Sequence, residues 1–221
     1  MRSYFLILSA CISMSLSYAQ SYNKWSVEVG FGNHFGLQPS SGKSGFHQFQ
    51  AIQLGARYMF NPYIGLMGTG GYDLLDFKGL GSDNQQLVRT SLQAVINVGN
   101  LCNFQSKTNH VGLLFHTGVG STHMFAKQHK IANPRDPAIK NVDDIFSVYL
   151  GLSPQFKLHE RVTLYLDYSL SANFKQDNTF DFSKKLSGNG IGGAVHNMFI
   201  GLRFNLGSYK EHADWTGFMG G

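Results

Sequence analysis

The feature that most constrains the fold of this chain is an alternation of apolar residues with small or polar residues, at a period of two. In 87–99, Val88, Leu92 and Ile96 lie on one parity and Gln93 lies on the other. Successive side chains of a β-strand point to opposite faces, so this period predicts strands. The alternation occurs in eight runs that are divided by turn-rich segments. These runs are 25–35, 48–60, 63–75, 87–99, 111–120, 146–156, 162–171 and 197–206.

Two architectures are compatible with this pattern. A soluble sandwich or barrel turns its apolar parity inward, and short strands suffice. A transmembrane barrel turns that parity toward lipid, needs tilted strands of about 9–11 residues and keeps a polar interior. Here the runs are long, the second parity is rich in Gly, Ser, Thr, Gln and Asn, and only 14% of the residues are charged. We therefore expect an all-β fold, an eight-stranded antiparallel up-and-down transmembrane β-barrel.

The beginning of the chain predicts export. Residues 1–19 combine one positive charge, an apolar run and a small-residue end at Ala19, which is typical of a cleaved signal peptide. The alternative is a lipoprotein signal, in which Cys11 would be acylated. The predicted organisation is thus a signal peptide, a barrel over 20–207 and a short periplasmic tail over 208–221.

The connections between the runs alternate in length and predict an orientation. The longer ones are 36–47, 76–86, 126–143 and 174–190, and the shorter ones are 61–62, 100–109 and 157–161. Outer-membrane barrels have long extracellular loops and short periplasmic turns. We therefore expect a barrel in the outer membrane of a Gram-negative bacterium, with both termini in the periplasm. An interfacial aromatic girdle is expected near the periplasmic ends, formed by Trp25, Tyr58, Phe60, Tyr63, Phe104, Phe156 and Phe204.

Several segments resemble those of OmpA-like outer-membrane barrels. Residues 153–158 followed by 161–167 resemble the hairpin between the sixth and seventh strands of that family, and the turn over 99–104 is similar to a family turn. Residues 201–207, followed by 211–215, resemble the end of the family's barrel. The resemblance spans most of the predicted barrel. Its motifs are structural, so it implies the fold and specifies no activity.

The resemblance also implies partners. Gly201 and Phe204 match a pattern similar to the terminal-strand signal that the barrel assembly machinery reads. In the family, the segment similar to 212–215 commonly leads into a linker and a peptidoglycan-binding domain. The sequence stops at Gly221, so we do not carry peptidoglycan tethering over. The expected partners are outer-membrane lipid and lipopolysaccharide, the assembly machinery during insertion, and an envelope protein complex.

Motifs that carry chemistry are scarce in the sequence. There is no nucleotide loop, zinc-protease motif or nucleophile elbow, so we expect no catalytic residue and no cofactor. The histidines are scattered, and we expect no metal site. Ser121 and His123 share the lipid-facing parity and would suit a lipid-modifying hydrolase, although polar residues at a strand end are the simpler interpretation. Cys102 is expected to be unpaired.

The predicted long loops are basic. Lys and Arg side chains there would attract lipopolysaccharide phosphates, or would be ordinary solvated charges. A high pI alone does not indicate nucleic-acid binding, so we expect none. The basic loop residues are Lys43, Lys78, Lys127, Lys130, Arg135, Lys140, Lys184 and Lys185.

Six charged residues lie on the inward parity, one on each of six strands. They are Glu28, Arg57, Asp73, Arg89, Asp167 and Arg203. The strand order predicts that Glu28 sits between Arg57 and Arg203 and that Asp73 faces Arg89. An eight-stranded barrel is only wide enough for side chains to fill, so these pairs would plug it. The sequence thus favours a non-enzymatic barrel with a structural or envelope-interaction role; the alternatives are a narrow diffusion pore and a lipid-modifying enzyme.

Overall fold

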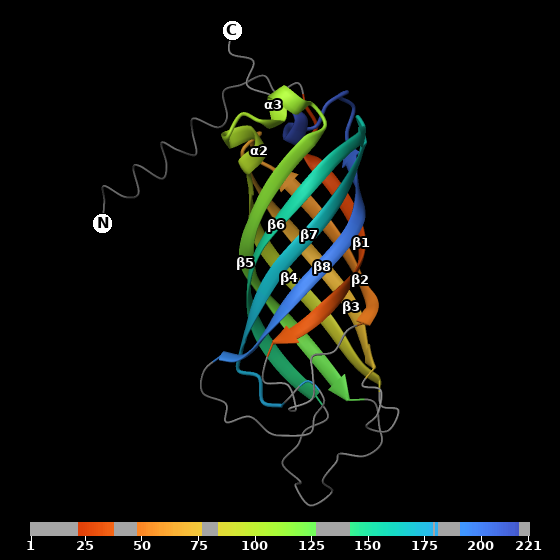
Figure 1. The fold of residues 1–221 in the computed structure, drawn as a ribbon, viewed down its shortest axis with the longest axis vertical. Helices are drawn as coiled ribbons and strands as arrows, with labels where there is room; N and C mark the ends of the chain where they lie inside the picture. The colour runs from red at the N-terminus through yellow and green to blue at the C-terminus, as the bar shows by residue number, and fades with distance from the viewer. Residues whose placement is uncertain are drawn as a thin grey trace, which may run out of the picture.

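Eight strands form one closed barrel in the computed structural model, which describes residues 22–37, 48–76, 84–126, 142–178, 180 and 191–216. Each strand is antiparallel to the strands before and after it, and β8 closes on β1 (Figure 1). The strands are β1 (Trp25–Leu37), β2 (Gln48–Met59), β3 (Ile64–Asp76), β4 (Asn84–Asn97), β5 (Val111–Ala126), β6 (Val142–His159), β7 (Val162–Phe174) and β8 (Ile191–Leu206). The predicted eight-stranded up-and-down β-barrel is confirmed.

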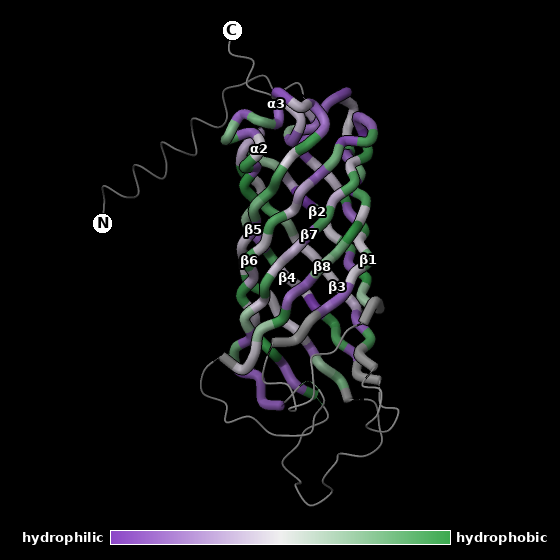
Figure 2. The backbone as a smooth tube through the Cα atoms, in the orientation of Figure 1, coloured by the Kyte–Doolittle hydropathy of each residue, from purple (hydrophilic) through white to green (hydrophobic). Residues whose placement is uncertain are grey.

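The apolar parity of the strands faces outward. Figure 2 shows hydrophobic and hydrophilic positions alternating along the strands. Phe31 and Leu54 are both 60% exposed on the outer surface, whereas Arg57 and Arg203, inside the barrel, are at most 1% exposed. This is the reverse of a soluble barrel, so the soluble alternative is wrong. The strands are 12–18 residues long, which exceeds the span that a bilayer requires.

The two ends of the barrel differ, and we name them by their connections. The turn end holds the short connections at 60–63 and 160–161, the helices α2 (Val98–Leu101) and α3 (Gln105–Thr108), and the 3₁₀ helix η1 (Ala213–Trp215). The loop end is the opposite end, where β1, β3, β5 and β7 finish. The connection expected over 100–109 thus contains two short helices. None of the described helices is long and apolar enough to cross a membrane.

An aromatic cluster lies on the outer surface at the turn end. The ring of Tyr58 lies 4.9 Å from that of Trp25 and 5.4 Å from that of Phe60, measured between centroids. Phe204 and Phe156 are also exposed near the turn-end limits of their strands. Amphipathic and aromatic rings at this level are typical of the boundary between acyl chains and headgroups.

The pairing of β8 with β1 closes the barrel and depends on a pair of glycines. Thirteen consecutive residues of β1 pair with β8, and Gly30 lies opposite Gly201. Tyr165 projects across this pair: a Cβ on Gly201 would lie 2.2 Å from the carbonyl oxygen of Val29 and 2.6 Å from the Tyr165 hydroxyl. The two glycines therefore make room inside the barrel for a large side chain of β7.

We expect Gly201→Ala to destabilise the barrel by about 1–3 kcal/mol, because the added methyl must displace backbone or Tyr165. The matched control is Gly70→Ala, because a Cβ there meets nothing within 4 Å. Urea unfolding of both variants in lipid vesicles measures the difference. Equal midpoints for the two variants would contradict the assigned packing at the seam.

Candidate functional site in the barrel lumen

The lumen is lined by polar and charged side chains, which makes it the candidate functional site. All six charged residues expected on the inward parity have their side chains inside the barrel. A buried charge is costly unless it is paired and hydrogen-bonded. The arrangement of partners therefore decides what the lumen can do.

Glu28 of β1 and Arg203 of β8 form an ion pair near the turn end. The two residues are direct partners in the strand register. The Glu28 carboxylate oxygen Oε2 accepts from Arg203 Nε at 2.9 Å and lies 2.8 Å from Arg203 Nη2. Arg203 Nη1 donates to Gln155 Oε1 at 2.8 Å, and the guanidinium lies 5.0 Å from the centre of the Tyr165 ring. The structure thus places Arg203 in a fully partnered, buried site.

Arg57 makes its direct contacts with residues other than Glu28. Its Nη2 donates to the carboxylate of Asp214, and its Nε donates to Ser26 Oγ at 3.3 Å. The register explains the difference, because the partner of Glu28 on β2 is Gly55, whereas Arg57 pairs with Ser26, two residues nearer the turn end. The direct partner of Arg57 is thus Asp214, and Glu28 acts on Arg57 by electrostatic attraction from a greater distance.

Asp214 comes from the segment after β8, which folds back into the turn end. We call residues 211–215 the C-terminal plug. The chain reverses at Gly207, whose φ of +135° favours glycine, and runs beside Asn23. The backbone N–H of Asn23 donates to the backbone carbonyl of Glu211 at 2.8 Å. The backbone N–H of Ala213 donates to the backbone carbonyl of Asn23 at 2.9 Å. The expected tail over 208–221 is thus, in its described part, built into the barrel mouth.

The turn after β4 supplies donors that hold the plug. The backbone carbonyl of Asp214 accepts from Asn97 Nδ2 and Asn100 Nδ2, each at 3.2 Å, and from Gln105 Nε2. Trp215 Nε1 donates to Thr163 Oγ1 at 3.3 Å. The helices α2 and α3 therefore position amide side chains above the mouth.

The carboxyl of Asp214 is ionised at neutral pH. Burial alone would raise the pKa of Asp214, but the Arg57 guanidinium and His212 together hold that pKa well below its usual range. A carboxylate is thus present to neutralise Arg57, which has lost its contact with water.

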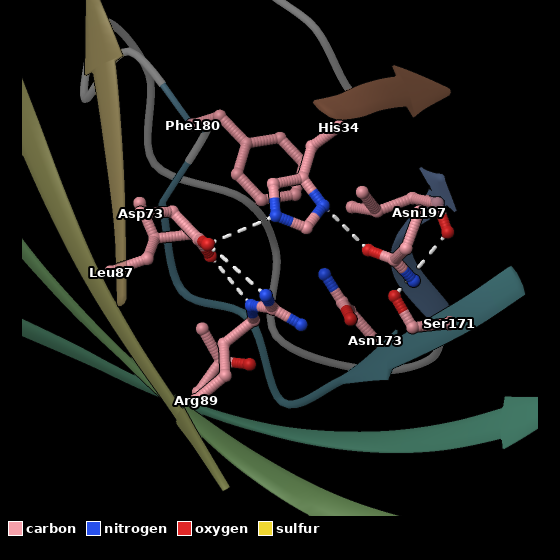
Figure 3. A pocket seen from close by; sticks show the side chains of 10 residues that line it. His34, Asp73, Leu87, Arg89, Ser171, Asn173, Phe180 and Asn197 are labelled. Atoms are coloured by element: carbon pink, nitrogen blue, oxygen red, sulfur yellow. Dashed lines mark hydrogen bonds and ion pairs between the residues drawn. The ribbon is translucent and has the colours of Figure 1, made fainter. Parts of the chain in front are cut away.

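Asp73 and Arg89 meet at the loop-end half of the lumen. Arg89 Nε donates to Asp73 Oδ2 at 2.5 Å, and Arg89 Nη2 donates to Asp73 Oδ1 at 3.0 Å. The expected facing pair is therefore present as a two-pronged contact. His34 of β1 joins it, with Nε2 3.0 Å from Asp73 Oδ1, and these residues line a small pocket together with Asn197 (Figure 3).

Asp167 pairs with a histidine in the lumen. Its Oδ2 lies 2.7 Å from His116 Nε2 and accepts from the hydroxyl of Ser153. His116 Nδ1 lies 2.6 Å from Gln93 Oε1. A hydrogen-bonded chain thus crosses the barrel from β4 through β5 to β6 and β7.

The segment after β7 covers part of the loop end. The Asp143 carboxylate accepts from the backbone N–H of Asp177 at 2.9 Å and of Asn178 at 2.7 Å. Gln176, Asn178 and Phe180 are each at most 3% exposed. Figure 3 shows the Phe180 ring beside His34.

The other candidate residues lie elsewhere. Ser121 and His123 belong to the outward parity near the loop end, where His123 Nδ1 lies 2.6 Å from Asp144 Oδ1 rather than contacting Ser121. Gly201 faces inward, Phe204 faces outward, and Cys102 is an exposed free thiol. No three His, Cys, Asp or Glu side chains gather to hold a metal among the residues described.

Some sequence predictions lie outside the described residues. These are the signal peptide over 1–19 with Cys11, and the basic loop residues Lys43, Lys78, Lys127, Lys130, Arg135, Lys140, Lys184 and Lys185.

Comparisons with known proteins bear on the fold. No protein-family model matches the chain, and no curated protein matches it. The Neisserial surface protein A structure aligns with a TM-score of 0.53 at 12% identity, covering 82% of this chain and 97% of the other. A major outer membrane protein from Thermus thermophilus also gives a TM-score of 0.53, at 17% identity over 83% and 99% of the two chains. The fold is that of the eight-stranded outer-membrane β-barrels.

A third similar structure of this outer-membrane barrel fold is Ail, the attachment invasion locus protein of Yersinia pestis. It aligns with a TM-score of 0.51 at 14% identity, covering 84% of this chain and 99% of Ail. A structure of Ail with the heparin analogue sucrose octasulfate aligns with a TM-score of 0.50 at 15% identity, over the same shares of the two chains. At these identities the likeness shows a shared barrel fold. The properties of the lumen depend on the residues of this chain.

We expect Asp214→Asn to release the C-terminal plug, because it leaves the buried Arg57 without a carboxylate, at a cost of about 3–5 kcal/mol. Trp215 should then become accessible to acrylamide, measured by fluorescence quenching in a Trp25→Phe background. The control in the same segment is Glu211→Gln, whose exposed side chain is outside the lumen. Unchanged Trp215 quenching in Asp214→Asn would contradict the role given to the Arg57–Asp214 pair.

Proposed function

We propose that this protein is a non-enzymatic outer-membrane barrel with a structural or envelope-interaction role, whose lumen is closed by its own side chains. The observation that carries the proposal is the partnering of the lumen charges. Arg203 binds Glu28, Arg89 binds Asp73, and Arg57 binds Asp214 of the plug. Charged side chains that pair with one another inside the barrel occupy the space that a solute would need.

Covers at both ends support the same conclusion. The plug occupies the turn end with Asp214 and Ala213 fully buried, and Gln176, Asn178 and Phe180 lie over the loop end. A diffusion pore of this size would instead leave a hydrated path between its mouths. The closed interior favours action through the outer surface and the loops.

The location follows from the outer surface. The apolar belt suits acyl chains, and aromatic rings at the turn end suit the interface. In this proposal the barrel spans the outer membrane of a Gram-negative bacterium, with the turn end and both termini in the periplasm. Its partners are outer-membrane lipid, lipopolysaccharide at the basic loops, the assembly machinery and an envelope complex.

Two alternative functions make different demands. A narrow pore requires that the ion pairs be hydrated and separable. A lipid-modifying enzyme gains one supporting contact, that of His123 with Asp144, because a carboxylate orients a histidine base. Both side chains are well exposed, at 44% and 73%, and such pairs contribute little on their own. Incubation of the purified protein with outer-membrane lipid distinguishes the enzyme from the non-enzymatic barrel, because only an enzyme releases fatty acid.

We expect the wild-type barrel to show no steady conductance in planar bilayers and Glu28→Ala to raise it. Removing Glu28 takes away the carboxylate that pairs with Arg203, and water must enter to solvate the guanidinium. The control is Glu160→Ala, which removes an exposed pair with Lys210. A wild type that conducts steadily, with a conductance unaffected by Glu28→Ala, would reject the closed lumen and favour the pore.

We expect Phe204→Ala to lower the amount of barrel in the outer membrane while leaving export intact. Phe204 lies on β8, whose pairing with β1 removes the last unpaired backbone edge, which lipid cannot solvate. The control is Phe156→Ala, an exposed aromatic of β6 at the same end. Protease protection in cell fractions measures insertion, and equal levels of both variants would reject an assembly signal at Phe204.

A further inference from the structure

The imidazole of His34 lies between two hydrogen-bond acceptors at the loop end of the lumen. Its Nδ1 lies 2.7 Å from Asn197 Oδ1, and its Nε2 lies 3.0 Å from Asp73 Oδ1 (Figure 3). His34 is 4% exposed, so water does not replace these contacts from outside. The question is therefore which ring nitrogens carry hydrogen.

The surrounding contacts fix which atoms face the two ring nitrogens. Asn197 Nδ2 donates at 3.3 Å to the backbone carbonyl of Ser169, which can only accept, so the amide oxygen of Asn197 faces His34. Asp73 is held through both oxygens by Arg89, which keeps it a carboxylate. Both nitrogens of His34 thus face acceptors, and a neutral ring can donate to only one of them.

We propose that His34 is a proton-operated latch. When the ring carries two protons it ties β1 to β3 through Asp73 and to β8 through Asn197. When it loses one, a lone pair faces the Asp73 carboxylate and that contact opens. This inference rests on the closed lumen of the proposed function. It adds that pH controls the contact between β1 and β3 in the loop-end half of the lumen.

The groups that face His34 account for this behaviour. Burial and Arg89 from β4 oppose the second proton, and Asp73 from β3 favours it. The other described residues around this pocket are uncharged; they are Leu87, Thr122, Ser171, Asn173, Phe180 and Val195. Arginine does not release its proton in proteins, whereas imidazole titrates between pH 5 and 8. His34 is thus the member of the cluster that can gain or lose a proton.

His116 provides an internal comparison. It also lies between an amide, Gln93, and a carboxylate, Asp167. The other partner of the Gln93 side chain is the hydroxyl of Ser91, 2.7 Å away, which can donate or accept. The Gln93 amide can therefore turn over and satisfy a neutral His116. Of these two histidines, His34 is thus the one whose two neighbours are both fixed as acceptors.

The test is ¹⁵N NMR of the histidine rings in the refolded full barrel between pH 5 and 9, with His34 assigned by His34→Gln. We expect two protonated ring nitrogens at pH 5 and loss of one as the pH rises. A neutral His34 at every pH, or an imidazolium that persists to pH 9, would overturn the proposal. Ring protonation is read independently of conductance, so failure here is distinguishable from failure of the closed lumen.

Stability gives a second readout. A group that gains or loses a proton inside the folded barrel makes the free energy of unfolding depend on pH. Between pH 5 and pH 9 the unfolding midpoint of the wild type should depend on pH more strongly than that of His34→Gln. The control His123→Gln, on the outer surface, should keep the wild-type pH profile. Identical profiles for wild type and His34→Gln would also overturn the latch.

Discussion

Closure of the backbone hydrogen-bond ladder between β8 and β1 is the constraint on which the rest of this structure depends. A bilayer interior offers no partner for a peptide group, so a sheet can sit there only if it has no edge. Once the sheet is closed with its apolar parity toward lipid, the other parity has to fill the inside. The composition of that parity, small residues with a few charges, then determines whether the interior conducts.

The charged side chains inside the barrel form ion pairs with oppositely charged neighbours. Each pair draws its two residues from a different part of the chain. Glu28 and Arg203 pair across the closing seam, so the same register that closes the barrel also brings them together. Arg57 lies nearer the turn end and takes its carboxylate from the plug. The C-terminal segment is therefore part of the lumen chemistry as well as of the turn end.

The strand alternation was sufficient to predict the topology because side-chain parity is a local property of each strand. It also predicted the Asp73–Arg89 pair, since antiparallel order and height along neighbouring strands bring those residues together. It could not place Asp214, because 211–215 has no strand period and its position depends on a reversal at Gly207. The histidines His34 and His116 were visible on the inward parity, but their carboxylate partners come from non-adjacent strands and depend on the barrel's stagger.

The most direct test of a filled and closed lumen is the exchange of arginine side-chain protons with water. In lipid nanodiscs, the guanidinium Nε–H groups of Arg203 and Arg57 should exchange slowly and give resolved NMR signals, because their partners and the plug exclude water. Arg161, exposed in the turn between β6 and β7, provides the reference for free exchange. Exchange of Arg203 and Arg57 as fast as that of Arg161 would contradict the account.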